Sequence, residues 1–153
     1  MFLLDVISVS IGVEVQGGTV VKLIDRNSAV ATKRSHIFTT SADNQPSMVL
    51  HFVEGEHDKP SENRTLAVLE LEGIPPAPRC LHQVEVSASL DANSIVTFSA
   101  MNLGTGKEIS VTAHPSAMEE ATALIRSPQW TELRRLSPVR MPATTPPPPV
   151  SDD

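Results

Sequence analysis

The chain has 153 residues, of which 40% are apolar and only 3% aromatic, so one domain can bury a core built mainly from aliphatic side chains. The formal net charge of −6 disfavours nucleic acid and an anionic membrane surface as partners. The single cysteine, Cys80, excludes an internal disulfide framework.

The N-terminal part of the chain alternates apolar and polar residues with period two. Ile7, Val9, Ile11, Val13 and Val15 alternate with polar residues or glycine, which predicts a strand over residues 7–15. Successive side chains of a strand point to opposite faces, so these five share one face. The Gly17-Gly18 pair that follows is typical of a tight hairpin turn, with a return strand over residues 19–24.

The same signal recurs along the next ninety residues. Segments of alternating or continuous apolar residues are separated by turn residues, and the proline-rich stretch 73–79 does not qualify as a central strand. Further strands are predicted at residues 36–40, 48–53, 66–71, 84–88, 95–100 and 109–113. About eight short strands at roughly ten-residue spacing favour an all-β sandwich or barrel.

The character of the sequence changes after Ala113. Ser116, followed three residues later by Glu119, has the arrangement of a capping box, which predicts a helix from Ser116 that runs through Ile125 and ends before Pro128. A further helical turn is expected within residues 130–136. Residues 137–153 are rich in proline, and we expect a disordered or polyproline-II tail there.

Blocks of residues along the chain resemble the substrate-binding domain of Hsp70 chaperones, in order and without insertion or deletion over residues 2–113. The blocks are Asp5-Val6, Ser10–Glu14, Gly17-Gly18, Leu23–Asn27, Thr32-Lys33, Phe38–Thr40, Ala42–Gln45, Glu54–Glu56, Gly73–Arg79, Gln83–Val86, Asp91–Asn93 and Gly104–Glu108.

The resemblance implies a sandwich of two four-stranded antiparallel sheets that binds extended apolar peptide segments, rich in Leu and flanked by basic residues. It implies an open apolar slot lined by Val13, Phe38, Met48 and Leu50, with Ile11 behind them. It also implies that Thr39 and Gln45 lie beside the peptide backbone, and that Gln16 and Ser41 form an arch over it. From pattern alone, Phe38, Met48 and Leu50 would be ordinary core residues.

The resemblance also sets an expected domain organisation. Residues 1–5, with Phe2, Leu3, Leu4 and Asp5, resemble the linker that joins the ATPase domain of the family, and residues 6–113 form the peptide-binding sandwich. Residues 114–136 correspond to a truncated lid, and residues 137–153 to the tail. We therefore expect no ATPase domain in this chain, and Arg79 loses the lid residue to which it would latch.

Phosphate-binding, metal-binding and nucleophilic roles have less support in the sequence. Gly104–Lys107 lacks the remaining residues of a phosphate-binding loop and is better explained as a hairpin turn. His51, Glu54, Glu56 and His57 have no recognised metal-ligand spacing and are interpreted as a solvated strand end. Cys80 has no identifiable partner base that would make it a nucleophile.

We therefore predict a non-enzymatic chaperone module that binds unfolded segments as a holdase, without a cofactor or metal of its own; in the family, ATP is used by the domain that this chain lacks. An apolar start interrupted by Asp5, and the lack of any run near the roughly 18 apolar residues of a membrane span, favour a cytoplasmic protein. The alternatives are a module that docks to a co-chaperone or to a separate ATPase domain, and an inactive fragment.

Overall fold

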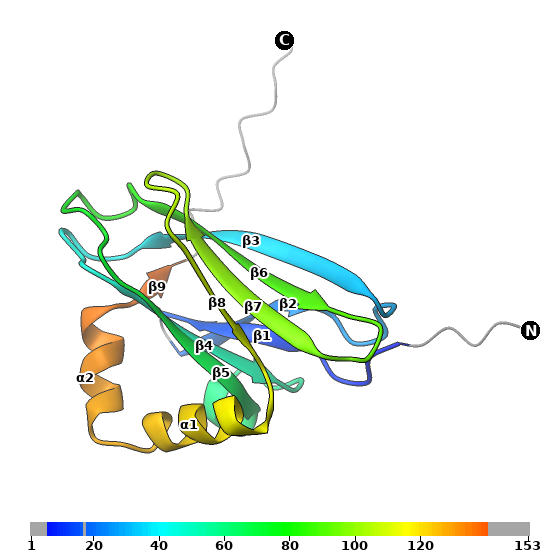
Figure 1. The fold of residues 1–153 in the computed structure, drawn as a ribbon. Coiled ribbons are helices and arrows are strands. Elements are labelled where there is room, and N and C mark those ends of the chain that lie inside the picture. The colour runs from blue at the N-terminus through cyan, green and yellow to red at the C-terminus, as the bar shows by residue number, and fades with distance from the viewer. Residues whose placement is uncertain (1–5, 17, 141–153) are drawn as a thin grey trace, which may run out of the picture.

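Two antiparallel sheets packed face to face make up most of the computed structural model, which describes residues 6–16 and 18–140 (Figure 1). The first sheet has the order β2-β1-β4-β5, and the second has the order β8-β7-β6-β3-β9. The strands of the first sheet are β1 (Ile11–Val15), β2 (Thr19–Ile24), β4 (Met48–Glu54) and β5 (Arg64–Leu71). Those of the second are β3 (Thr32–Thr40), β6 (Gln83–Leu90), β7 (Val96–Asn102), β8 (Glu108–Thr112) and β9 (Val139–Arg140).

The core lies between the sheets. Phe52 of β4 stacks on Phe98 of β7, with ring centroids 4.0 Å apart, and both side chains are fully buried. Around this pair the core consists mainly of Val, Leu, Ile and Ala, as the low aromatic content requires. The predicted sandwich class is therefore confirmed.

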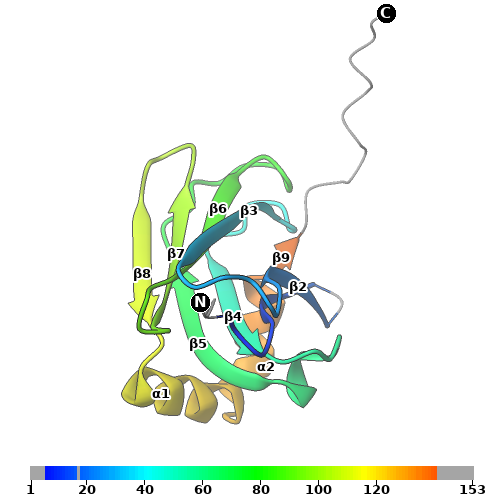
Figure 2. The ribbon, with the colours of Figure 1, turned by 90° about the vertical axis from the view of Figure 1, so that its right-hand side faces the viewer.

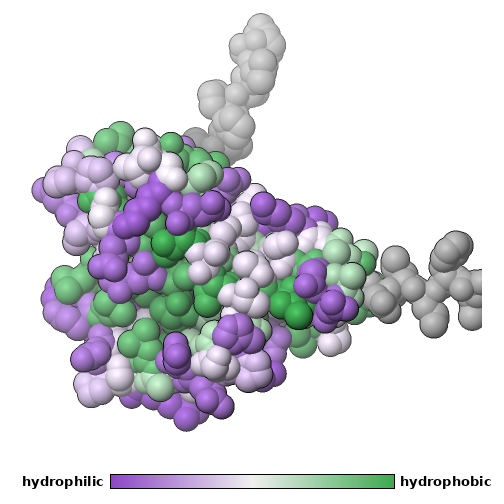
Figure 3. All heavy atoms as spheres, in the orientation of Figure 1, coloured by the Kyte–Doolittle hydropathy of each residue, from purple (hydrophilic) through white to green (hydrophobic). Residues whose placement is uncertain are grey.

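Edge strands β5 and β8 come together along one side of the sandwich. Hydrophobic residues are visible across the middle of this face in Figure 3, with hydrophilic residues toward its margins. Ile109 and Val111 of β8 are only partly buried and pack against the core from this side.

Two helices and one 3-10 turn complete the described chain. The 3-10 turn η1 (Pro60–Glu62) lies between β4 and β5, and helix α1 (Pro115–Ile125) packs against β5 (Figure 2). Helix α2 (Gln129–Leu136) follows and leads directly into β9. None of the helices in the described ranges has the length and apolarity that a membrane crossing needs.

Several predicted boundaries are wrong. The first strand starts at Ile11, not at residue 7, and Val6 makes only an isolated bridge to Ala29. Strand β3 starts four residues early, at Thr32, because its exposed polar half pairs with β6 as far as Leu90 and so needs no apolar alternation.

The helix prediction needs two corrections. His114 occupies the N-cap of α1 with Pro115 at its first turn, so Ser116 is inside the helix, where its hydroxyl contacts His114 Nδ1 at 2.9 Å. Trp130 to Leu136 belong to a helix of eight residues, not to a single turn.

The predicted tail is also partly wrong. Ser137 and Val139 are buried, and Val139–Arg140 add a fifth strand to a sheet for which four strands were expected. A proline-rich composition did not prevent pairing here, because the carbonyl groups of residues 137–140 all find hydrogen-bond donors, as described below. The tail prediction for residues 141–153, and the linker prediction for Phe2, Leu3, Leu4 and Asp5, lie outside the described residues.

Candidate functional site

Strands β1 and β4 form a ladder at one end only. Ile11, Gly12 and Val13 pair with Glu54, Val53 and Phe52, and beyond Val13 the ladder between the two strands stops. This leaves a gap between the two strands, which we call the opening. It lies between Val15 and Gln16 on one side and Met48 and Val49 on the other. Residues 137–140, which we call the 137–140 segment, lie in this opening and continue along the edge of β3 (Figure 1).

The four apolar residues predicted to line the slot, and the fifth predicted to lie behind them, are brought together. Each is at least 96% buried, and all belong to one cluster that also contains Val139. These residues are Ile11, Val13, Phe38, Met48 and Leu50. The expectation of an open slot is wrong, because the apolar surface that an empty slot would expose to water is covered by Val139, itself 3% exposed.

The backbone of the 137–140 segment is bound at every carbonyl. The Val49 N–H donates to the Ser137 carbonyl at 3.1 Å, and the Gln16 N–H donates to the Val139 carbonyl at 2.7 Å. The Gln45 side-chain amide donates to the Pro138 carbonyl at 2.8 Å, and the Thr39 hydroxyl donates to the Arg140 carbonyl at 3.4 Å. Thr39 and Gln45 are the two residues predicted to lie beside a bound backbone, and here they lie beside this one.

Gln45 also organises the loop between β3 and β4. Its side-chain oxygen accepts from the N–H groups of Ser41 and Ala42 at 3.0 and 3.2 Å, and its amide nitrogen donates to the Ser47 carbonyl at 2.7 Å. Gln45 is buried. One side chain thus holds both the loop conformation and the backbone of the segment, so a change in the loop also changes the contact with the segment.

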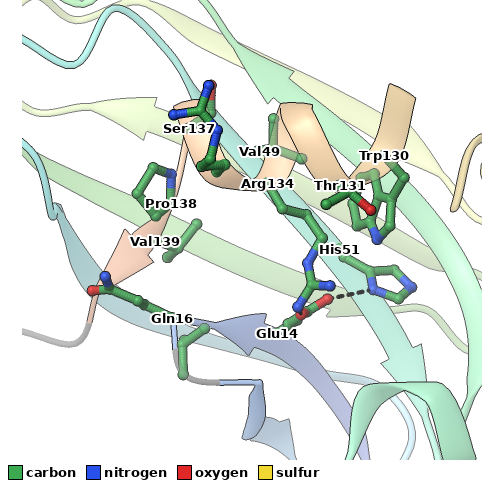
Figure 4. Close-up of a pocket in the computed structure, with 12 residues that line it drawn as sticks. Glu14, Gln16, Val49, His51, Trp130, Thr131, Arg134, Ser137, Pro138 and Val139 are labelled. Atoms are coloured by element: carbon green, nitrogen blue, oxygen red, sulfur yellow. Dashed lines mark hydrogen bonds and ion pairs between the residues drawn. The ribbon is translucent and has the colours of Figure 1, made fainter. Parts of the chain in front are cut away.

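The two residues predicted to form an arch, Gln16 and Ser41, lie on either side of the site without a described contact between them. Gln16 lies beside the segment through its backbone, and its side chain is exposed next to Val139 (Figure 4). Ser41 is half-buried, and its hydroxyl has no hydrogen-bond partner within the described part of the chain. The described contacts do not connect Gln16 with Ser41.

A second set of contacts holds α2 on the outer face of the β1–β4 pair. Glu14 and His51 alternate with the core residues Val13 and Leu50, so they point away from the core. Glu14 binds His51 Nδ1 at 2.9 Å on one carboxylate oxygen and Arg134 of α2 on the other, and His51 Nε2 contacts the Thr65 hydroxyl at 2.9 Å.

Trp130 of α2 covers this pair. Its ring meets His51 edge-on, with centroids 5.4 Å apart, and it is 7% exposed (Figure 4). We call Glu14, His51, Trp130 and Arg134 the α2 anchor. Between it and the 137–140 segment remains a cleft of about 410 Å³, lined by α2, β1 and β4.

The α2 anchor was not predicted from the sequence, and the interpretation of His51 was wrong. His51 is 4% exposed, not part of a solvated strand end, because α2 covers it. Only Glu14 gave a signal: a carboxylate on an otherwise aliphatic strand needs a partner if its outer face is covered. Among residues 6–16 and 18–140, no group of three or more His, Cys, Asp or Glu side chains is arranged to hold a metal ion.

The other predicted polar residues have local roles. Glu56 accepts hydrogen bonds from the N–H and the hydroxyl of Ser10 at 2.7 and 2.8 Å. These two hydrogen bonds, the backbone one first, lower the pKa of Glu56 below its ordinary value, and Lys22 and Arg26 act in the same direction. Cys80 is exposed, and Gly104–Lys107 lies in the turn between β7 and β8.

A protein-family model described as Hsp70 protein matches residues 1–127. The matched range contains both sheets up to β8, helix α1, and every residue predicted for the slot, the arch and the linker. Helix α2 and the 137–140 segment follow after its end.

Proposed function

The chain belongs to the Hsp70 family, and from this membership we propose that it binds extended apolar segments of unfolded proteins in the opening between β1, β4 and β3. In this role it would act as a holdase, keeping client segments from aggregating. We further propose that the chain has no catalytic activity and no cofactor of its own, and that it acts in the cytoplasm.

The observation that carries the proposal is the way in which the opening holds the 137–140 segment. An extended backbone has its carbonyls bound by Val49, Gln45, Gln16 and Thr39, while one aliphatic side chain enters the apolar cluster. Backbone contacts of this kind do not depend on side-chain identity, and a single pocket supplies preference. This combination suits a site that accepts many sequences.

The expected affinity follows from the same contacts. Burying one aliphatic side chain contributes about 1.5–3 kcal/mol, and each hydrogen bond contributes about 0.5–1.5 kcal/mol net. Ordering the peptide opposes binding by several kcal/mol. One side chain and the four hydrogen bonds seen for the segment give at most about 9 kcal/mol before that cost, so we expect an affinity no tighter than micromolar, about −8 kcal/mol.

The proposed client chemistry is a Leu-rich segment with basic flanks. Every site residue at the base of the pocket is aliphatic, aromatic or Met, which favours an aliphatic side chain there. The net charge of −6 favours positively charged flanks, and Arg140 has this position next to Val139.

Fluorescence polarisation with a labelled peptide that has leucines at its centre and arginines at its ends tests the proposal. We expect saturable micromolar binding, and no binding of a matched peptide with aspartates in place of the leucines. Equal binding of both peptides would mean that charge alone attracts them. Absence of binding to a folded chain from which the 137–140 segment has been displaced would refute the proposal.

Gln45→Ala provides the site variant, and Lys33→Gln provides its control. Gln45 lies in the loop after β3 and contacts the bound backbone. Lys33 is exposed at the other end of β3, where it pairs with Ser89 of β6. In a chain from which the 137–140 segment has been displaced, we expect Gln45→Ala to weaken binding of the leucine peptide several-fold and Lys33→Gln to leave its affinity unchanged. Circular dichroism shows whether both variants keep the strands.

A further inference from the structure

We propose that the 137–140 segment is a built-in ligand of the peptide site, so that every client must displace this part of the same chain before it binds. The inference rests on the function proposed above and adds to it the regulation of the site. It concerns residues that lie outside the range matched by the family model.

The segment has the features expected of a client. It is extended and antiparallel to β3, with Thr39 opposite Arg140 and Thr40 opposite Val139. Its four consecutive carbonyls, from Ser137 to Arg140, all accept hydrogen bonds from the opening. It is apolar where it enters the cluster, at Val139, and basic at the next residue. Contacts between the hydroxyls of Ser137 and Ser47 complete the set.

Strand β9 makes fewer backbone pairings than the strands that form the body of the sheet. Only two residues of β9 pair with β3, and on its other side β9 reaches β1 through the single bond from Gln16 to Val139. By comparison, β6 pairs with β3 over eight residues, from Thr32 to Thr39. The other strands therefore keep their own ladders without β9, so displacing it breaks only its own pairing and uncovers the apolar cluster for another ligand.

The α2 anchor keeps this ligand close to its site. Leu136 ends α2 and Ser137 begins the segment, so no free linker lies between them. Trp130 and Arg134 fix α2 to His51 and Glu14. These two residues lie on the outer face of β1 and β4, the strands that border the opening. A tether that matches the distance gives an effective concentration on the order of millimolar, so a client must compete with the segment at that concentration.

Two consequences follow for the site. Its apparent affinity for a client is reduced by the fraction of molecules in which the segment has left. Contacts that hold α2, although they do not touch a client, also set that affinity, because they hold the segment in place.

Val139→Asp in the full chain is the direct test, since a carboxylate cannot remain in the apolar cluster without a partner. Two labelled probes are used: the leucine-centred peptide, and a peptide with the sequence of residues 134–140. We expect Val139→Asp to bind both at least about tenfold more tightly than the unchanged chain does. A version of the second probe with Asp in place of Val should not bind.

The outcomes separate this inference from the proposed function. Equal affinity of the two chains for the leucine peptide would overturn the built-in ligand while leaving the proposed function intact. A folded Val139→Asp chain that binds neither probe would refute the proposed function and this inference together. Loss of cooperative unfolding in Val139→Asp would also overturn the inference, because it would make the segment an integral strand.

The α2 anchor gives a second, independent measurement with a matched control. Arg134→Ala removes the contact to Glu14 on β1, whereas Arg135→Ala removes only a contact to Glu132 within α2. Neither residue is among those that bind the segment's carbonyls. We expect Arg134→Ala to raise the affinity for the leucine peptide several-fold and Arg135→Ala to leave it near that of the unchanged chain. The same effect from both variants, or from neither, would contradict the role of the anchor.

Discussion

The inner and the outer surface of the β1–β4 pair hold the C-terminal part of the chain in different ways. On the inner side, Val139 inserts into an aliphatic cluster and the backbone carbonyls of its segment are bound. On the outer side, α2 is held by an ion pair and an aromatic contact, through Arg134 on Glu14 and Trp130 on His51. The inner contacts would serve many sequences, whereas the outer contacts require these particular side chains.

The difference suggests a division of tasks. A site that contacts mainly backbone atoms can exchange its ligand. Specific side-chain contacts beside the site can hold one particular ligand close to it. Substitutions on the inner side, on the outer side and at a position remote from both therefore test whether the two sides differ in this way.

The largest expected effect is on the inner side. Leu50→Ala removes a fully buried side chain from the cluster that surrounds Val139, and we expect a loss of about 2–5 kcal/mol in the free energy of unfolding. Urea denaturation measures it. A loss well below 1 kcal/mol would show that Leu50 lines an open slot, as the sequence suggested, instead of a filled core.

The next effect is on the outer side. Glu14→Ala leaves His51 buried without its carboxylate partner and Arg134 without its contact to β1, and we expect a loss of about 1–3 kcal/mol. Trp130 is the only tryptophan, so its fluorescence reports on α2 directly. We expect its emission to shift to longer wavelength as the ring becomes exposed to water.

A control separates this effect from general destabilisation. Leu50→Ala should leave the Trp130 emission of the folded protein unchanged, because the Leu50 side chain lies on the opposite face of β4 from His51 and Trp130. If the emission of Glu14→Ala also stays unchanged, packing of Trp130 alone holds α2, and the ion pair between Arg134 and Glu14 is not required on the outer surface.

The smallest effect is a pH dependence remote from both surfaces. Because the pKa of Glu56 is lowered in the folded chain, its carboxylate stabilises the fold fully above the unfolded-state pKa and progressively less as the pH falls through the folded-state value. Glu56→Gln cannot titrate. We therefore expect the unchanged chain to be more stable than this variant at neutral pH, with the gap narrowing in acid.

Urea denaturation of both chains at neutral and acidic pH measures this gap. A gap that stays constant with pH would mean that the pKa of Glu56 is the same in the folded and the unfolded chain, and would contradict the prediction. Since Glu56 contacts neither the segment nor α2, peptide affinity at neutral pH should not change.

Much of the fold was predictable from local patterns. The alternation at Ile11, Val13 and Val15, and the strands centred on Leu50, Leu69, Val86 and Phe98, all correspond to observed strands, because half-buried strands leave a period-two trace. The exposed half of β3 left no such trace, so its start at Thr32 was missed. The N-cap of α1 was missed because Ser116 and Glu119 imitate a capping box that starts two residues after the true N-cap, His114.

The candidate site was predictable only in part. Resemblance to a family placed Thr39 and Gln45 beside a bound backbone, and in the structure they contact the backbone of the 137–140 segment. That this backbone comes from the chain itself could not be predicted, since Ser137-Pro138-Val139-Arg140 has no strand pattern of its own. His51 looked like a surface residue because nothing near it in sequence indicates the helix that covers it.

The sequence by itself determined the two sheets, their strand spacing and the family, because these follow from alternation, turn residues and ordered motifs that act over short distances along the chain. Only the tertiary structure decided that the opening is filled and that Glu14 and His51 are buried. Those outcomes depend on contacts between residues about 80 to 120 positions apart, such as Arg134 with Glu14 and Val139 with Thr40, and the free energy of such contacts arises only once the sandwich has formed.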